Sequence, residues 1–95
     1  MTDTDVLIGA DSMWSVTAIS PERETYTAEE LQRLVGGHFE LLRDPVVDTV
    51  SGKTYDVWVN EEPFLFNMPL NALASRIVGV ELFGPVVFTL KGRVK

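Results

Sequence analysis

The sequence predicts an α+β fold, a small domain with a mainly antiparallel sheet of about four strands and two short helices. Its length of 95 residues is that of a single domain, and a chain this short is not expected to build two independent cores. Its hydrophobic share of 45% and charged share of 23% are typical of globular proteins. Strand-like segments alternate with two capped helical segments. We expect one domain over residues 1–95, with frayed ends at 1–5 and 91–95.

The first strand is expected over residues 13–19, because this stretch is rich in β-branched and aromatic residues. Pro21 follows it, and proline cannot continue a ladder of backbone hydrogen bonds. The apolar run at 6–8 is a shorter candidate strand, with a turn at 9–12 between the two.

The first helix is predicted over residues 28–35. Thr27 and Glu30 have the spacing of a capping box, in which each side chain satisfies a backbone N–H group at the start of a helix. Gly36 and Gly37 end the segment, because glycine readily adopts the left-handed conformation that closes a helix.

Two further strands are predicted at 38–43 and 55–59, paired with each other in antiparallel orientation. The first stops at Asp44–Pro45, and the Ser-Gly pair within 48–53 indicates a turn. In the second strand, Trp58 lies on the opposite face from the apolar residues on either side of it.

Residues 60–71 are expected to form an ordered loop, because prolines interrupt its apolar run. Its aromatic residues are either packed onto the core or exposed as an interface. Asn71 can cap a second helix over 72–78. A last strand is expected at 86–90.

The composition excludes several classes of function. A net charge of −6 and a pI near 4.6 disfavour binding to the phosphate backbone of nucleic acid. The chain has no cysteine, which excludes disulfides and thiolate metal sites. The N-terminus lacks the apolar run of a signal peptide, and no stretch is long enough to cross a bilayer, so we expect a cytoplasmic protein with no membrane partner.

Residues 31–40 read Leu-Gln-Arg-Leu-Val-Gly-Gly-His-Phe-Glu, residues 59–62 read Val-Asn-Glu-Glu, and residues 68–73 read Met-Pro-Leu-Asn-Ala-Leu. This ordered set resembles an uncharacterised domain family of bacteriophages, plasmids and bacteria, with the pattern L-Q-x-x-V-G-G-x-I-E, then V-x-N-E-E-G, then G-L-P-x-N. Pro63 stands where that pattern has glycine, and Asn67-Met68 replaces its Gly-Leu. The resemblance implies a fold and a mobile-element origin, but no activity.

Few residues point to catalysis or to metal binding. His38 is the single histidine, and no nucleophile and carboxylate are spaced to act with it. An enzyme would need a carboxylate pair, Glu40 with Glu61 or Glu62, that the sequence does not bring together. Two adjacent carboxylates, as in Glu61-Glu62, seldom point at one cation. We therefore predict no enzymatic activity, no metal site and no cofactor.

Aromatic anchors dominate the energetics of protein interfaces, which directs attention to Trp58 and to the loop after it. The residues expected at a binding surface are Trp58, Asn60, Glu61, Glu62, Phe64, Phe66, Asn67 and Asn71. The main hypothesis is a non-enzymatic protein-binding module of mobile-element origin, acting as an inhibitor of a host defence or regulatory protein. Its partner would be basic or nucleic-acid-binding, and a homodimer remains open. The acidic residues expected to steer such a partner are Glu22, Glu24, Glu29, Glu30, Asp56, Glu61 and Glu62.

The alternative hypothesis is a small-ligand or nucleotide-binding protein with a pocket beside the 60–71 loop. Small-molecule sites are mostly apolar and contain a few precisely placed polar groups. Asn60, Asn67, Asn71 and Arg76 are the candidates for those groups.

Overall fold

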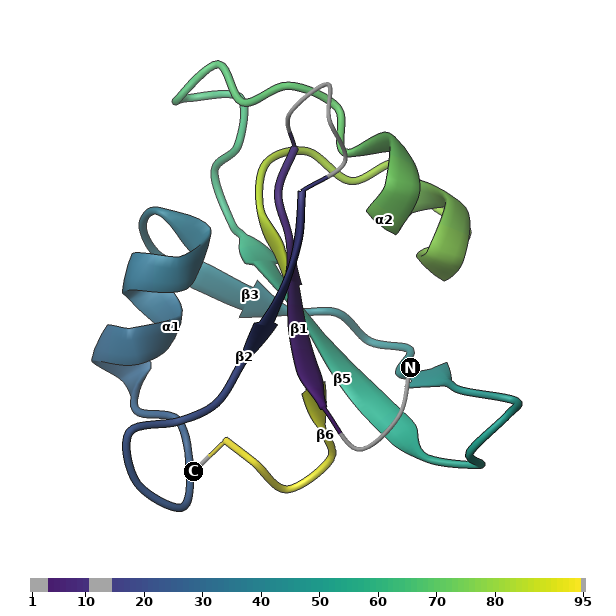
Figure 1. Cartoon of the computed structure of the whole chain (residues 1–95). Coiled ribbons are helices and arrows are strands. Elements are labelled where there is room, and N and C mark those ends of the chain that lie inside the picture. Colours follow the sequence, from purple (N-terminus) through teal and green to yellow (C-terminus); the bar gives the residue numbers. More distant parts are fainter. Residues whose placement is uncertain (1–3, 11–14, 95) are drawn as a thin grey trace.

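The computed structural model describes residues 4–10 and 15–94, and an antiparallel sheet forms its centre (Figure 1). The elements are β1 (Asp5–Ile8), β2 (Val16–Ile19), α1 (Ala28–Val35), β3 (Phe39–Leu41), β4 (Val46–Val47), β5 (Thr54–Asn60), α2 (Ala72–Val78) and β6 (Val86–Leu90). The strand order is β2-β1-β6-β5-β3, and β4 pairs with β5. The predicted α+β class is confirmed, but the sheet has six strands where the sequence predicted about four.

Both helices have the bounds that the sequence predicts. At α1 the Thr27 hydroxyl accepts from the Glu30 N–H at 3.1 Å, while the Glu30 carboxylate accepts from the Thr27 N–H at 3.0 Å. The Asn71 side chain accepts from the Ala74 N–H at 3.1 Å at the start of α2. No helix among the described residues is long and apolar enough to span a membrane.

The extra strands lie where the sequence pattern is shortest. β1 is the candidate strand at 6–8, and it pairs with both β2 and β6 inside the sheet. β4, which is two residues long, has no counterpart among the expected strands. In the strand predicted at 13–19, positions 13 and 14 lie outside the described residues, and β2 begins at Val16.

The two helices cover opposite faces of the sheet (Figure 1). The apolar cluster on the α2 face includes Val57, Val59, Ala74 and Phe88. The cluster on the α1 face contains Tyr26, Leu31, Val35, Trp58 and Val87. One sheet therefore separates two clusters, because alternate residues of β5 and β6 point to opposite faces.

Polar contacts join the two ends of the described chain to the fold. Asp5 is 1% exposed, and its carboxylate accepts hydrogen bonds from the Tyr26 hydroxyl at 2.9 Å and the Leu90 N–H at 2.8 Å. Arg93 forms an ion pair with the same carboxylate at 3.3 Å, and Val94 forms a parallel bridge with Tyr26. These contacts join the two ends of the described chain within the ranges expected to fray, and residues 1–3 and 95 lie outside the described residues.

Candidate binding surface

The segment between β5 and α2 projects from one end of the sheet (Figure 1). Phe64, Leu65 and Phe66 are 71%, 68% and 53% exposed, and we call these three residues the apolar tip. Exposed apolar side chains that adjoin one another are uncommon on soluble monomers and mark interaction surfaces more often than isolated ones do. Of the two alternatives left open by the sequence, core packing does not hold for these three side chains, which lie on the surface.

Backbone hydrogen bonds hold the apolar tip in this exposed position. The Met68 N–H donates to the Pro63 carbonyl at 2.9 Å and closes the base of the loop. The Glu62 N–H donates to the side-chain oxygen of Asn60 at 2.7 Å and fixes the point at which the chain leaves β5. Asn67 has a φ of 53°, a left-handed conformation that asparagine tolerates better than most residues. The tip is thus part of an ordered loop.

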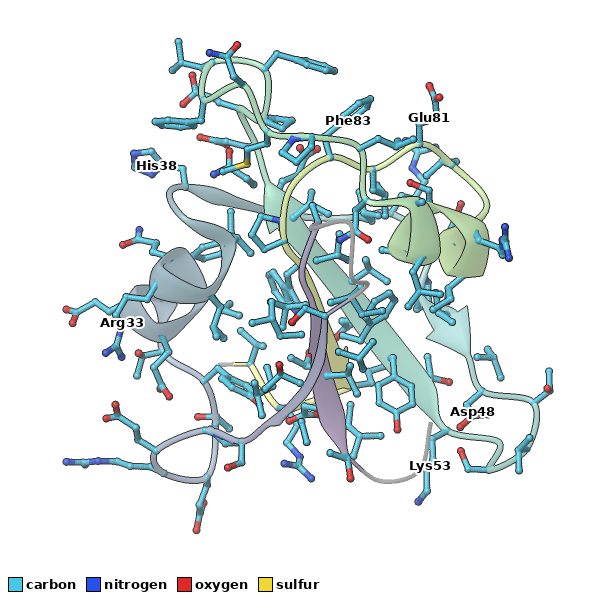
Figure 2. The ribbon with its side chains drawn as sticks, turned by 45° about the horizontal axis from the view of Figure 1, so that its top comes forward. Arg33, His38, Asp48, Lys53, Glu81 and Phe83 are labelled. Atoms are coloured by element: carbon cyan, nitrogen blue, oxygen red, sulfur yellow. The ribbon has the colours of Figure 1, made fainter. Side chains whose placement is uncertain are left out.

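Side chains beneath the tip fasten the loop to the rest of the domain. The rings of Phe64 and Phe83 have centroids 4.8 Å apart and are inclined at 57°. Met68 packs so closely on Gly84 that a Cβ atom there would collide with its sulfur, and Gly84 has a φ of +80°. Figure 2 shows Phe83 at this end of the molecule. Only glycine meets both requirements at position 84.

A surface groove of about 310 Å³ lies beside the apolar tip. Its apolar lining includes Val59, Leu82, Phe64 and Phe83, and three carboxylates, those of Glu40, Glu61 and Glu81, line it as well. We call this hollow the acidic groove. Val59 and Leu82 are buried members of the cluster on the α2 face, so the groove opens directly onto the core.

The three carboxylates of the acidic groove come from three separate segments. Glu40 lies on β3 opposite Val59, Glu61 follows β5, and Glu81 lies in the turn before β6. All three are exposed, and none of the described lining residues is basic. The sequence suggested Glu40 with Glu61 or Glu62; the structure brings Glu40 and Glu61 to one groove and leaves Glu62 out of its lining. Glu81 was missed, because no local pattern marks it.

Trp58 does not belong to the exposed surface. It is buried under α1, its indole N–H donates to the Thr89 hydroxyl at 2.9 Å, and its ring meets that of Phe39 edge-on at 5.6 Å. The alternation of β5 was interpreted correctly, but the face on which Trp58 lies is covered by a helix. Its expected place in a binding patch is therefore corrected to a place in the core.

Asn60 and Asn71 are also buried, and their side chains hold the fold together. The Asn60 amide donates to the carbonyl of Val35, the last residue of α1, at 3.2 Å. The Asn71 amide donates to the carbonyls of Ile8 and Gly84, both at 2.9 Å. Neither side chain is presented outward as expected, because each satisfies backbone groups that would otherwise be buried without partners.

Glu30, expected among the steering carboxylates, is occupied at the start of α1. It is buried, and it accepts from the N–H groups of Thr27 and Glu22, both at 3.0 Å. These backbone donors, Thr27 first, lower the pKa of the Glu30 carboxyl below its ordinary value. A hollow of about 410 Å³ beside α1 is lined by Glu30 together with Tyr26. Burial, and then the hydrogen bond to Asp5, raises the pKa of the Tyr26 hydroxyl.

His38 is exposed at the start of β3, where its backbone carbonyl accepts from the Glu61 N–H at 2.9 Å (Figure 2). Within residues 4–10 and 15–94, no group of three or more histidine, aspartate or glutamate side chains is arranged to hold a metal ion. Among the described residues, the apolar tip and the acidic groove are thus the two candidate binding surfaces. Comparisons with protein-family models, curated proteins and solved structures find no match, and the resemblance to phage and plasmid domains stays a prediction.

Proposed function

We propose that this chain is a non-enzymatic protein-binding module that docks through the apolar tip and the acidic groove onto a basic surface of its partner. The observation that carries the proposal is the exposure of Phe64, Leu65 and Phe66 on an ordered loop. A rigid aromatic anchor loses little conformational entropy on binding, and such anchors supply most of the binding energy of protein interfaces.

Charge supports a basic partner. The chain carries a net charge of −6. Exposed carboxylates lie near the apolar tip: Glu61 and Glu62 precede it in the chain, and Glu81 lines the acidic groove with Phe64. Complementary charge accelerates association and suppresses wrong partners. The same carboxylates repel the phosphates of nucleic acid, so the proposed partner is a protein.

In its narrower form, the proposal makes this partner a host defence or regulatory protein that the chain inhibits by covering a basic surface. Proteins that act on nucleic acid carry such surfaces. Support for this form comes from the acidic rim of the groove and from the sequence resemblance to domains of mobile elements. Loss of the partner's nucleic-acid binding on addition of this chain is the expected result.

The small-ligand alternative has less support, because its four polar groups do not meet. Asn60 and Asn71 are engaged with backbone carbonyls inside the fold. Arg76 lines a separate hollow of about 450 Å³ beside α2. Asn67, at the exposed loop, is the one remaining candidate, and a specific pocket needs several convergent polar groups.

The proposed function can be tested by photo-crosslinking in extracts of the source cell. A benzoylphenylalanine placed at Leu65 is expected to capture a protein, and capture should weaken as salt is raised. The matched control places the same group at Val50, which is 93% exposed in the turn between β4 and β5. Phe64→Ser combined with Phe66→Ser should abolish capture at Leu65. Because Phe64 also contacts Phe83, Phe66→Ser is measured alone as well; its ring is half exposed, so this change should weaken capture without changing the thermal unfolding midpoint greatly. Equal capture at Leu65 and Val50, or none at Leu65, would overturn the proposal.

A further inference from the structure

We infer that the acidic groove receives one arginine side chain of the partner protein. The inference rests on the proposed function and specifies the chemistry of the contact. The volume of about 310 Å³ is at the lower end of the range found for ligand sites, which suits a single side chain rather than a folded segment.

The floor of the groove suits the aliphatic part of an arginine. Val59 and Leu82 line it and belong to the buried cluster on the α2 face. Long basic side chains place their methylene groups on apolar surface while the charged end stays among polar groups. Val59 and Leu82 are each only 7% exposed, so most of the apolar surface that the side chain would remove from water belongs to Phe64.

The three carboxylates suit the charged end. Glu40, Glu61 and Glu81 come from three segments of the chain and all line the groove, and no described lining residue is basic. A guanidinium group has five N–H donors in a planar fork, so it can satisfy more than one carboxylate at a time.

The aromatic wall favours arginine over other cations. Phe64 contacts Phe83 at 4.8 Å between centroids but keeps 71% of its surface exposed, so ring surface remains for a guanidinium to stack on. An ammonium is more strongly hydrated and does not stack in this way. A hard divalent cation would take oxygen ligands on all sides, which an apolar floor does not offer.

The test uses n-butylguanidinium as the probe, followed by ¹H–¹⁵N NMR on the whole chain. Shifts are expected at the amides of Glu61, Phe64 and Phe83, with a dissociation constant of about 1 mM, a magnitude set by the small size of the probe. Glu61→Gln and Glu81→Gln should each weaken binding several-fold, whereas Glu24→Gln, an exposed carboxylate in the loop before α1, should leave it unchanged. The neutral isostere n-butylurea should bind at least tenfold more weakly.

Three results would overturn the inference: equal binding of n-butylurea, equal binding of n-butylammonium, or shifts confined to residues outside the groove. The probe needs no partner, so its outcome is separate from the crosslinking experiment. Capture at Leu65 without guanidinium binding would remove the arginine site and leave the protein-binding role standing. Guanidinium binding without capture at Leu65 would overturn the protein-binding role. The inference would then fall as well, because no partner protein would supply the arginine.

Discussion

The carboxylate of Asp5 in the first strand and the hydroxyl of Tyr26 before α1 lie 2.9 Å apart, and both side chains are buried. Through this carboxylate the start of the described chain contacts the Leu90 N–H and the Arg93 guanidinium near its other end. The same group thus joins β1, the approach to α1 and the segment after β6.

Replacing Asp5 with alanine is expected to destabilise the domain by about 3–5 kcal/mol, because one change removes the partner of three donors and leaves some of them buried. Tyr26→Phe, which removes one hydrogen bond and keeps the ring, should cost about 1 kcal/mol. Urea unfolding at neutral pH measures both. Asp44→Ala, at an exposed carboxylate in a bend, is the control and should change stability by less than about 0.5 kcal/mol. A cost for Asp5→Ala no larger than the control's would contradict the assigned role.

Acid is expected to weaken α1 through Glu30. Since the folded pKa of this carboxyl is lowered, its contribution to stability is present above the ordinary value of 4.5 and is lost as the pH falls through the lowered folded pKa. The stability advantage of the wild type over Glu30→Gln, measured by urea unfolding from pH 7 to pH 2, should therefore shrink below that value. Glu29→Gln, in the same turn but exposed, should show little such change. A constant advantage for Glu30 at all pH values would refute this.

Thr89→Val is expected to cost about 1–3 kcal/mol, because it leaves the buried indole N–H of Trp58 without its acceptor while keeping the shape of the side chain. Thr17→Val, on the exposed strand β2, serves as the matched change and should be close to neutral. Chemical denaturation of the two variants gives the comparison. Similar effects at both positions would show that the indole contact does not matter.

Gly84→Ala should destabilise the domain more than Gly52→Ala. Both glycines have a positive φ, +80° and +76°, but a Cβ at position 84 collides with Met68, whereas a Cβ at position 52 meets nothing. We expect about 1 kcal/mol at position 52 and at least 1–2 kcal/mol more at position 84. Adding Met68→Ala should recover part of the excess, measured as a thermal unfolding midpoint. If Gly84→Ala destabilises the domain no more than Gly52→Ala does, then Met68 can move aside at no cost in stability.

Local chemistry made both helices predictable. Thr27 with Glu30 marks the start of α1, and Asn71 and Gly79 mark the start and the end of α2. Each of these signals acts within a few residues. β4 escaped prediction because a two-residue strand has no periodicity. The central position of β1 depends on pairing with β6, about 80 residues away, which no window of the sequence contains.

The candidate site was predictable only in part, for the same reason. The loop carrying Phe64 and Phe66 was recognised from its composition, but the burial of Trp58 follows from the placement of α1 on that face. Glu81 and Phe83 reach the groove because β6 pairs with β5, which sets the turn before β6 beside the loop after β5. Tertiary pairing, rather than residue type, decides which carboxylates share a hollow.

Asn60 holds the base of the loop through both ends of its side-chain amide. Its nitrogen donates to the Val35 carbonyl at the end of α1, and its oxygen accepts from the Glu62 N–H. The loop is thus held at its base and through the contact of Phe64 with Phe83, while the exposed side chains of Leu65 and Phe66 contribute little to the stability of the domain. Substitutions at Leu65 or Phe66 can therefore accumulate almost freely as far as folding is concerned. In a protein built this way, the side chains of the proposed binding surface can change in response to a changing partner while the fold stays the same.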